Sequence, residues 1–111
     1  MEISFASSKL AKLCNSQQEM RGKLGPRCAE RLQQRLEELR AAATLEDMRS
    51  LPGARCHELT QDRKGQLAVD LVHPRRLVFE PANDPVPTKA DGGLDWSKVT
   101  EVVILEVVDY H

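Results

Sequence analysis

The spacing of apolar residues predicts helices in the first part of the chain. Residues 2–5 alternate between polar and apolar side chains, which predicts a short strand. Apolar residues then recur every three or four positions, which predicts a serine-capped helix and, after an interruption at Asn15-Ser16, a second helix over 17–24.

A third and longer helix is predicted to begin at Gly25-Pro26, because proline suits the first turn of a helix. It should last to about Ala43, and Thr44 should begin one more short helical turn that ends at 51–53. One side of this helix is apolar and the others are charged. The apolar positions are Ala29, Leu32, Leu36 and Leu39.

The hydrophobic pattern changes in the second half, where segments rich in Val, Leu and Ile predict strands at 55–59, 66–72, 76–80 and 99–108. Short connections between the first three favour antiparallel neighbours. An irregular loop is predicted over 81–98, with three prolines and two glycines. Helices followed by strands predict an α+β fold, with N-terminal helices packed on a largely antiparallel sheet.

Length and composition are those of one globular domain spanning residues 1–111, with a helical part at about 7–50 and a sheet part at about 55–111. Hydrophobic residues make up 41% and charged residues 30%. The apolar runs are too short to span a bilayer, and the N-terminus lacks the apolar region of a secretory signal. We therefore expect a cytoplasmic protein that does not associate with membranes.

Charge is unevenly distributed, although the net charge is −1. Residues 1–64 hold 12 Lys/Arg against 9 Asp/Glu, whereas residues 65–111 hold 4 against 8. The basic residues of the helical part could follow phosphates or could form a solvated helix face. They are Arg21, Lys23, Arg27, Arg31, Arg35 and Arg40.

The cysteines at positions 14, 28 and 56 are too few and too far apart for a disulfide framework or a metal knuckle. Free cysteine commonly behaves as a small buried hydrophobe, so we expect structural roles. The candidate site described next also lacks the additional ligands that zinc requires. No metal and no other cofactor are therefore expected.

The candidate chemistry lies at the ends of the predicted strands. The sequence closes with Asp109-Tyr110-His111, while His57 and Arg76 lie in earlier strands. If these strands adjoin, histidines could transfer protons during attack by a ribose 2′-hydroxyl, and an arginine could stabilise the phosphate charge. An alternative is that a strand histidine and a terminal Tyr-His pair have no catalytic role.

These residues also carry a resemblance. The segment PGARCHELTQDRKGQLAVDLVHPRRLVFEP, followed later by VVILEVVDYH, resembles the HigB branch of the RelE/ParE superfamily of bacterial toxins, the plasmid-maintenance killer proteins. The shared pattern is a histidine and leucine, then Asp-Arg-x-Gly, an alternating strand, Arg-Leu-x-Phe and a closing Asp-Tyr-His. The helical first half fits as well, so the resemblance covers essentially the whole chain.

The resemblance implies a type II toxin of a toxin–antitoxin system, a ribosome-dependent mRNA endonuclease that inhibits translation without a metal. It implies the catalytic residues His57, Arg76, Asp109, Tyr110 and His111. We also expect Arg63, Lys64 and Arg75 to contact RNA. The implied partners are the ribosome, mRNA and a HigA-like helix-turn-helix antitoxin, in a toxin–antitoxin complex that is expected to be oligomeric.

Two other functions stay open at this stage. A non-enzymatic toxin of the ParE type would bind DNA gyrase and would not need His57 together with the terminal triplet. An inactive member would serve only as an antitoxin-binding subunit, and its expression would not slow growth. Because one fold can carry different functions, the site must distinguish between them.

Overall fold

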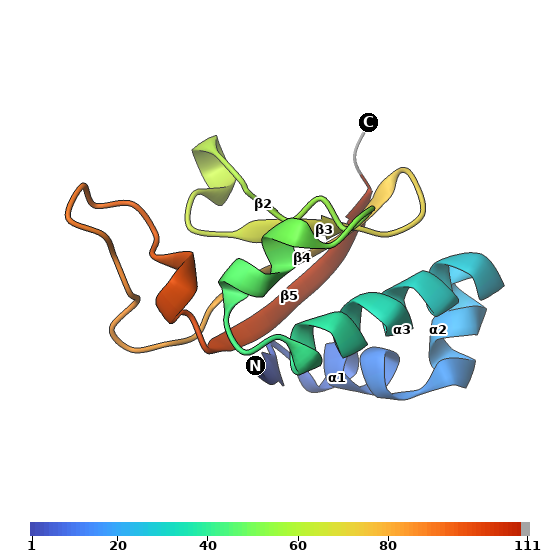
Figure 1. Cartoon of the computed structure of the whole chain (residues 1–111). Coiled ribbons are helices and arrows are strands. Elements are labelled where there is room, and N and C mark those ends of the chain that lie inside the picture. Colours follow the sequence, from blue (N-terminus) through green and yellow to red (C-terminus); the bar gives the residue numbers. More distant parts are fainter. Residues whose placement is uncertain (110–111) are drawn as a thin grey trace.

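The computed structural model describes residues 1–109 and has the predicted α+β fold, with three α-helices packed on one face of a five-stranded sheet (Figure 1). The helices are α1 (Ser8–Asn15), α2 (Gln17–Leu24) and α3 (Pro26–Ala41), and short 3₁₀ helices are η1 (Leu45–Ser50), η2 (Gln61–Arg63) and η3 (Trp96–Lys98). The strands are β1 (Glu2–Phe5), β2 (His57–Glu58), β3 (Leu67–Asp70), β4 (Arg75–Pro81) and β5 (Glu101–Asp109).

The helix boundaries follow the capping residues of the sequence. Ser7 accepts a hydrogen bond from the backbone N–H of Leu10, and Ser16 accepts one from Glu19, which fixes the starts of α1 and α2. Gly25 has a φ of 82°, a left-handed conformation that favours glycine, and it redirects the chain into α3. The predicted bounds of α2 are confirmed, whereas α3 ends two residues before Ala43.

The sheet has the strand order β1-β5-β4-β3-β2. Neighbouring strands are antiparallel except for β1 and β5, which pair in parallel with Glu2 opposite Glu101. The largely antiparallel character is therefore confirmed. The pairing of the first strand with the last was not predicted, because it joins segments about a hundred residues apart.

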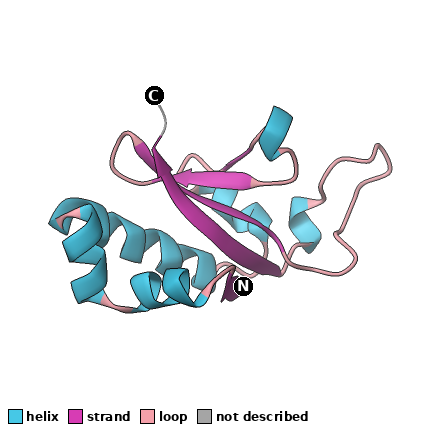
Figure 2. Ribbon diagram, turned by 180° about the vertical axis from the view of Figure 1, so that it is seen from behind, coloured by secondary structure: helices cyan, strands magenta, loops and turns pink. Residues whose placement is uncertain are grey.

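The core lies between α3 and the sheet. Leu32, Leu36 and Leu39 of α3 are almost completely buried, and the sheet contributes side chains such as Leu77 and Phe79 to the same cluster. Figure 2 shows from behind that the helices lie to one side of the sheet. Because neighbouring residues of a strand point to opposite faces, the residues between these core positions point away from the helices. We call that side the outer face.

The length of β2 and the burial of one arginine differ from prediction. Strand β2 has only two residues instead of the predicted 55–59, because Arg55 has a φ of 47° and interrupts the extended backbone. Among the basic residues of the helical part, Arg35 is not solvated. Its side chain is 1% exposed, and its guanidinium donates to Glu38 and to the backbone oxygen of Asp70. This arginine therefore joins α3 to β3.

Candidate active site

His57 is held by the backbone that precedes it. Its Nδ1 lies 2.7 Å from the carbonyl oxygen of Arg55. A carbonyl oxygen only accepts hydrogen bonds, so Nδ1 carries the proton in this contact. In the neutral ring Nε2 then has the lone pair, which leaves a basic nitrogen on the side of the imidazole away from the backbone. Arg55, whose carbonyl oxygen accepts this bond, has a φ of 47°.

The strand register places His57 on the outer face. His57 pairs with Ala68, Ala68 with Val78, and Val78 with Glu106, so this row crosses four strands. Residues directly opposite one another in antiparallel strands share a face of the sheet. Ala68 and Val78 are buried but lie outside the core cluster beneath the helices, as this assignment requires.

Arg76 lies in the next row on the same face, opposite Asp70 on one side and Val108 on the other. Its Nε is 3.3 Å from Asp70 Oδ1, while the other carboxylate oxygen of Asp70 lies 3.4 Å from Arg55 Nη1. One carboxylate therefore bridges two arginines. Arg35 bonds the backbone oxygen of Asp70 at 2.8 Å from within the core, which holds this residue in position.

Two predicted RNA-binding residues come from the connection between β2 and β3. The Arg63 guanidinium bonds Gln66 at 3.0 Å and Glu106 at 3.3 Å, so it lies over the outer face beside the row that contains His57. Lys64 is exposed next to it. The structure thus gathers His57, Arg76 and Arg63 on one surface.

Asp109 does not join this group. It pairs with Arg75 in the strand register, and Arg75 Nε lies 3.3 Å from its carboxylate. Arg75 also donates to the carbonyl oxygen of Leu24 in α2, which places the pair on the helix face. Strand alternation separates Arg75 from Arg76, and hence Asp109 from His57. Tyr110 and His111, the remaining predicted catalytic residues, lie outside the described residues.

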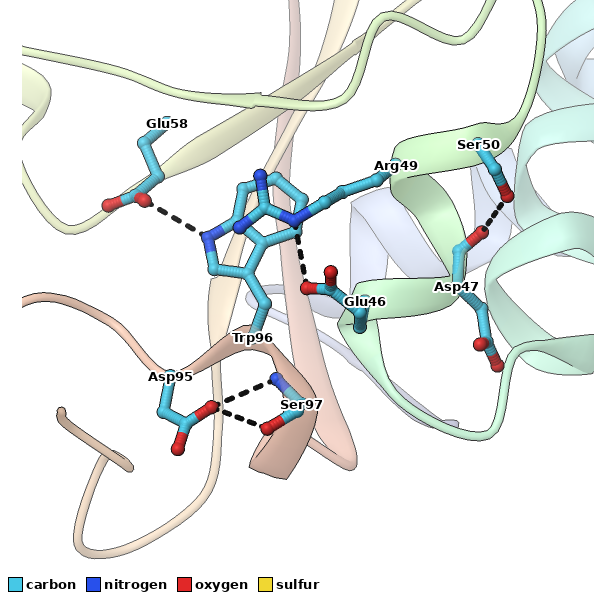
Figure 3. Close-up of polar contacts among 8 residues, drawn as sticks. All are labelled: Glu46, Asp47, Arg49, Ser50, Glu58, Asp95, Trp96 and Ser97. Atoms are coloured by element: carbon cyan, nitrogen blue, oxygen red, sulfur yellow. Dashed lines mark hydrogen bonds and ion pairs between the residues drawn. The ribbon is translucent and has the colours of Figure 1, made fainter.

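The long loop fastens β2 to the body of the protein (Figure 3). Trp96 is 4% exposed and donates from Nε1 to Glu58 at 3.0 Å, directly beside His57. On its other side Arg49 of η1 stacks 3.8 Å from the ring centroid and pairs with Glu46. The prediction that Trp96 pins the loop is confirmed. Because β2 pairs with only one neighbouring strand, this contact stabilises the segment that carries the histidine.

The cysteines of the described chain are free, and two of them, Cys14 and Cys28, are buried. Burial raises the pKa of Cys14 to about 11 and that of Cys56 to about 12, only partly offset by Arg40 and Arg49 respectively. These thiols are therefore protonated near neutral pH. Within residues 1–109, no three His, Cys, Asp or Glu side chains are grouped as metal ligands, and no helix is long and apolar enough to cross a membrane.

Sequence reasoning missed two contributors to this surface, Arg55 and Asp70. Arg55 acts through its carbonyl and its positive φ, for which residue type gives no signal. Asp70 is the acidic residue that ends an otherwise apolar strand, and this position could have marked it as a partner of a neighbouring arginine.

Of three comparisons with known proteins, the one with solved structures finds a likeness, and it concerns the fold. A scan against protein-family models and a search of curated proteins each find no match. Among solved structures, the chain is similar to a YoeB/ParE toxin from Agrobacterium tumefaciens, with a TM-score of 0.57 and 10% sequence identity over 100% of both chains. This likeness shows that the two chains share a fold.

Proposed function

We propose that this protein is the toxin of a toxin–antitoxin system and acts as a metal-independent endoribonuclease on mRNA at the ribosome. The observation that carries the proposal is the 2.7 Å contact between His57 Nδ1 and Arg55, which leaves Nε2 basic on the same sheet face as Arg76. The toxin fold and the sequence resemblance support it. The HigB assignment rests on that resemblance alone.

The reaction begins with removal of a proton from the ribose 2′-hydroxyl by Nε2 of His57. The 2′-oxygen then attacks the adjacent phosphorus, and the bond from phosphorus to the 5′-oxygen of the next nucleotide breaks. The products are a 2′,3′-cyclic phosphate and a 5′-hydroxyl end. Arg76 lies one row away on the same face, where its guanidinium can stabilise the negative charge that grows on the phosphate oxygens.

The departing 5′-oxygen needs a proton, and we assign this step to His111, with Tyr110 contacting the message. We assign Asp109 a structural role instead of the catalytic role expected from the sequence, because it pairs with Arg75 on the helix face. It secures the end of β5, from which the last two residues continue. Arg63 and Lys64 supply positive charge beside His57 for the RNA backbone.

The resemblance also supplies the proposed partners and location. A HigA-like helix-turn-helix antitoxin would neutralise the toxin in an oligomeric complex, and the ribosome would present the message to it in the cytoplasm. No bound metal is required, because each proton transfer and each charge in the mechanism has a protein group assigned to it.

The proposal is tested by incubating the purified protein with ribosomes programmed with a defined mRNA. We expect cuts that leave 5′-hydroxyl ends, that continue in excess EDTA, and that disappear when the nucleotide before the cut carries a 2′-deoxyribose. His57→Gln keeps a polar side chain without a basic nitrogen and should lower the cleavage rate by about 10²–10⁴-fold. An equal rate for His57→Gln and the wild type would refute the assignment of the base.

A further inference from the structure

The cavity between Arg55 and the connection from β3 to β4 lies beside the proposed cleavage site and shares Arg76 with it. It has a volume of about 340 Å³ and is lined by Arg55, His73, Arg75 and Arg76, with Asp70 as its acidic residue. The guanidinium of Arg75 pairs with Asp109 on the helix face, so Arg55 and Arg76 are the two arginines whose guanidinium groups meet the Asp70 carboxylate here. Such a concentration of guanidinium groups favours an oxyanion.

Contacts with Asp70 hold the side chains of Arg55 and Arg76 in position. The Asp70 carboxylate contacts Arg55 and Arg76 at 3.4 and 3.3 Å, and the buried Arg35 holds the backbone of Asp70. Asp70 therefore orients two guanidinium groups and neutralises one of their two charges. The Arg55 side chain is 67% exposed, so much of it is accessible to a ligand.

The cavity adjoins the candidate active site. Arg55 is two residues before His57, and the row of Asp70 and Arg76 is next to the row of His57 and Ala68. Rows two residues apart along a strand are separated by roughly 7 Å. One nucleotide can bridge this span, so an anion in the cavity would neighbour a phosphodiester aligned with His57.

We propose that this cavity is a second phosphate subsite, in which Arg55 and His73 bind the RNA phosphate next to the one that is cleaved. The subsite rests on the proposed function for the identity of its ligand. Arg76 stands between the two phosphates, and Arg55 supplies charge without taking part in proton transfer. Because the contacts are to the backbone, the subsite holds the RNA in register without selecting its sequence.

The test measures binding without cleavage. The probe is a fully 2′-O-methylated single-stranded RNA 12-mer, which lacks the attacking hydroxyl, and its Kd is measured over a range of salt concentrations. We expect Arg55→Gln to weaken binding about tenfold, since it removes a charge-assisted contact. The slope of log K against log salt should also decrease by about 0.7, the value for one phosphate contact on a single strand.

Two further variants make the test specific. Arg40→Gln removes the same charge from an exposed position at the end of α3, and it should bind as the wild type does. Arg55→Lys keeps the charge but not the planar fork, so it should retain the salt slope with intermediate affinity.

Equal binding by Arg55→Gln and the wild type would overturn the subsite, as would equal losses in Arg55→Gln and Arg40→Gln. Arg55-dependent binding of inorganic phosphate without RNA binding would overturn the assignment to RNA. Cleavage is not read in this assay. Failure of the proposed nuclease function would therefore leave an Arg55-dependent Kd intact, and failure of the subsite would leave the cleavage activity intact.

Discussion

The carbonyl oxygen of Arg55 lies 2.7 Å from Nδ1 of His57, and Arg55 itself has a backbone φ of 47°. A left-handed conformation is uncommon for a residue other than glycine, asparagine or aspartate. Strained backbone of this kind is concentrated at functional sites. The turn at Arg55 interrupts the extended backbone before β2, and the carbonyl of the same residue selects the proton position on the imidazole.

The contribution of the Arg55 backbone can be separated from that of its side chain. Arg55→Gly and Arg55→Val both lose the guanidinium, but glycine accepts a positive φ and a β-branched residue does not. We expect Arg55→Val to be less stable than Arg55→Gly by about 1–3 kcal/mol in urea unfolding. It should also cleave RNA more slowly.

Nitrogen-15 NMR of the His57 ring reads the tautomer in the same two variants. Arg55→Gly and Arg55→Val should both keep the proton on Nδ1, because the accepting carbonyl belongs to the backbone and is present in each variant. A mixture of tautomers in the folded proteins would mean that the carbonyl contact does not select the tautomer.

Arg35 should be one of the most sensitive positions for stability. Its side chain is 1% exposed, and its loss leaves the Asp70 carbonyl oxygen and Glu38 without their donor. We expect Arg35→Ala to lower the free energy of unfolding by about 3 kcal/mol. Arg40→Ala, on the exposed side of the same helix, should change it by less than about 0.5 kcal/mol. Similar unfolding midpoints for the two variants would contradict the buried role of Arg35.

Trp96 should determine how firmly the long loop and β2 are held. Trp96→Phe keeps most of the buried ring but removes the donor to Glu58, so we expect a loss of about 1 kcal/mol and faster proteolysis within the loop. Glu58→Gln keeps an oxygen that can accept this bond and serves as the control. If both variants were cleaved by protease at the wild-type rate, the Trp96 contact would not restrain the loop.

The cysteines should be unreactive in the folded protein. The pKa is raised by burial to about 11 for Cys14 and to about 12 for Cys56, so at pH 8 very little thiolate is present. We expect iodoacetamide to modify the native protein slowly and the urea-unfolded protein rapidly, as read by mass spectrometry. Rapid modification of Cys56 in the native state would show that its thiol is not shielded.

Much of the fold could be predicted because it depends on local signals. The serine caps, the Gly25-Pro26 break and the apolar stripe of α3 each act within a few residues, and the structure confirms the helices they predict. The parallel pairing of β1 with β5 depends on contacts between the two ends of the chain. No local pattern specifies that pairing.

The sequence predicts which types of residue form the candidate site better than it predicts how they are arranged in space. Alternation shows that neighbouring residues of a strand point to opposite faces, but only the register shows which face each residue occupies relative to another strand. Arg75 opposite Asp109 puts that acid on the helix face, while Arg76 opposite Asp70 lies on the outer face. A register shift between Val78 and Phe79 in the β4–β5 pairing makes this assignment impossible from sequence alone.

The most direct test of the central claim is the mapping of 5′-hydroxyl ends on cellular transcripts after brief induction of the wild type and of His57→Ala. We expect codon-phased cuts within translated messages for the wild type, and none for His57→Ala expressed as a folded protein at the same level. Intact messages in growth-arrested wild-type cells would contradict the nuclease and favour gyrase binding. Intact messages with normal growth would leave only an antitoxin-binding role.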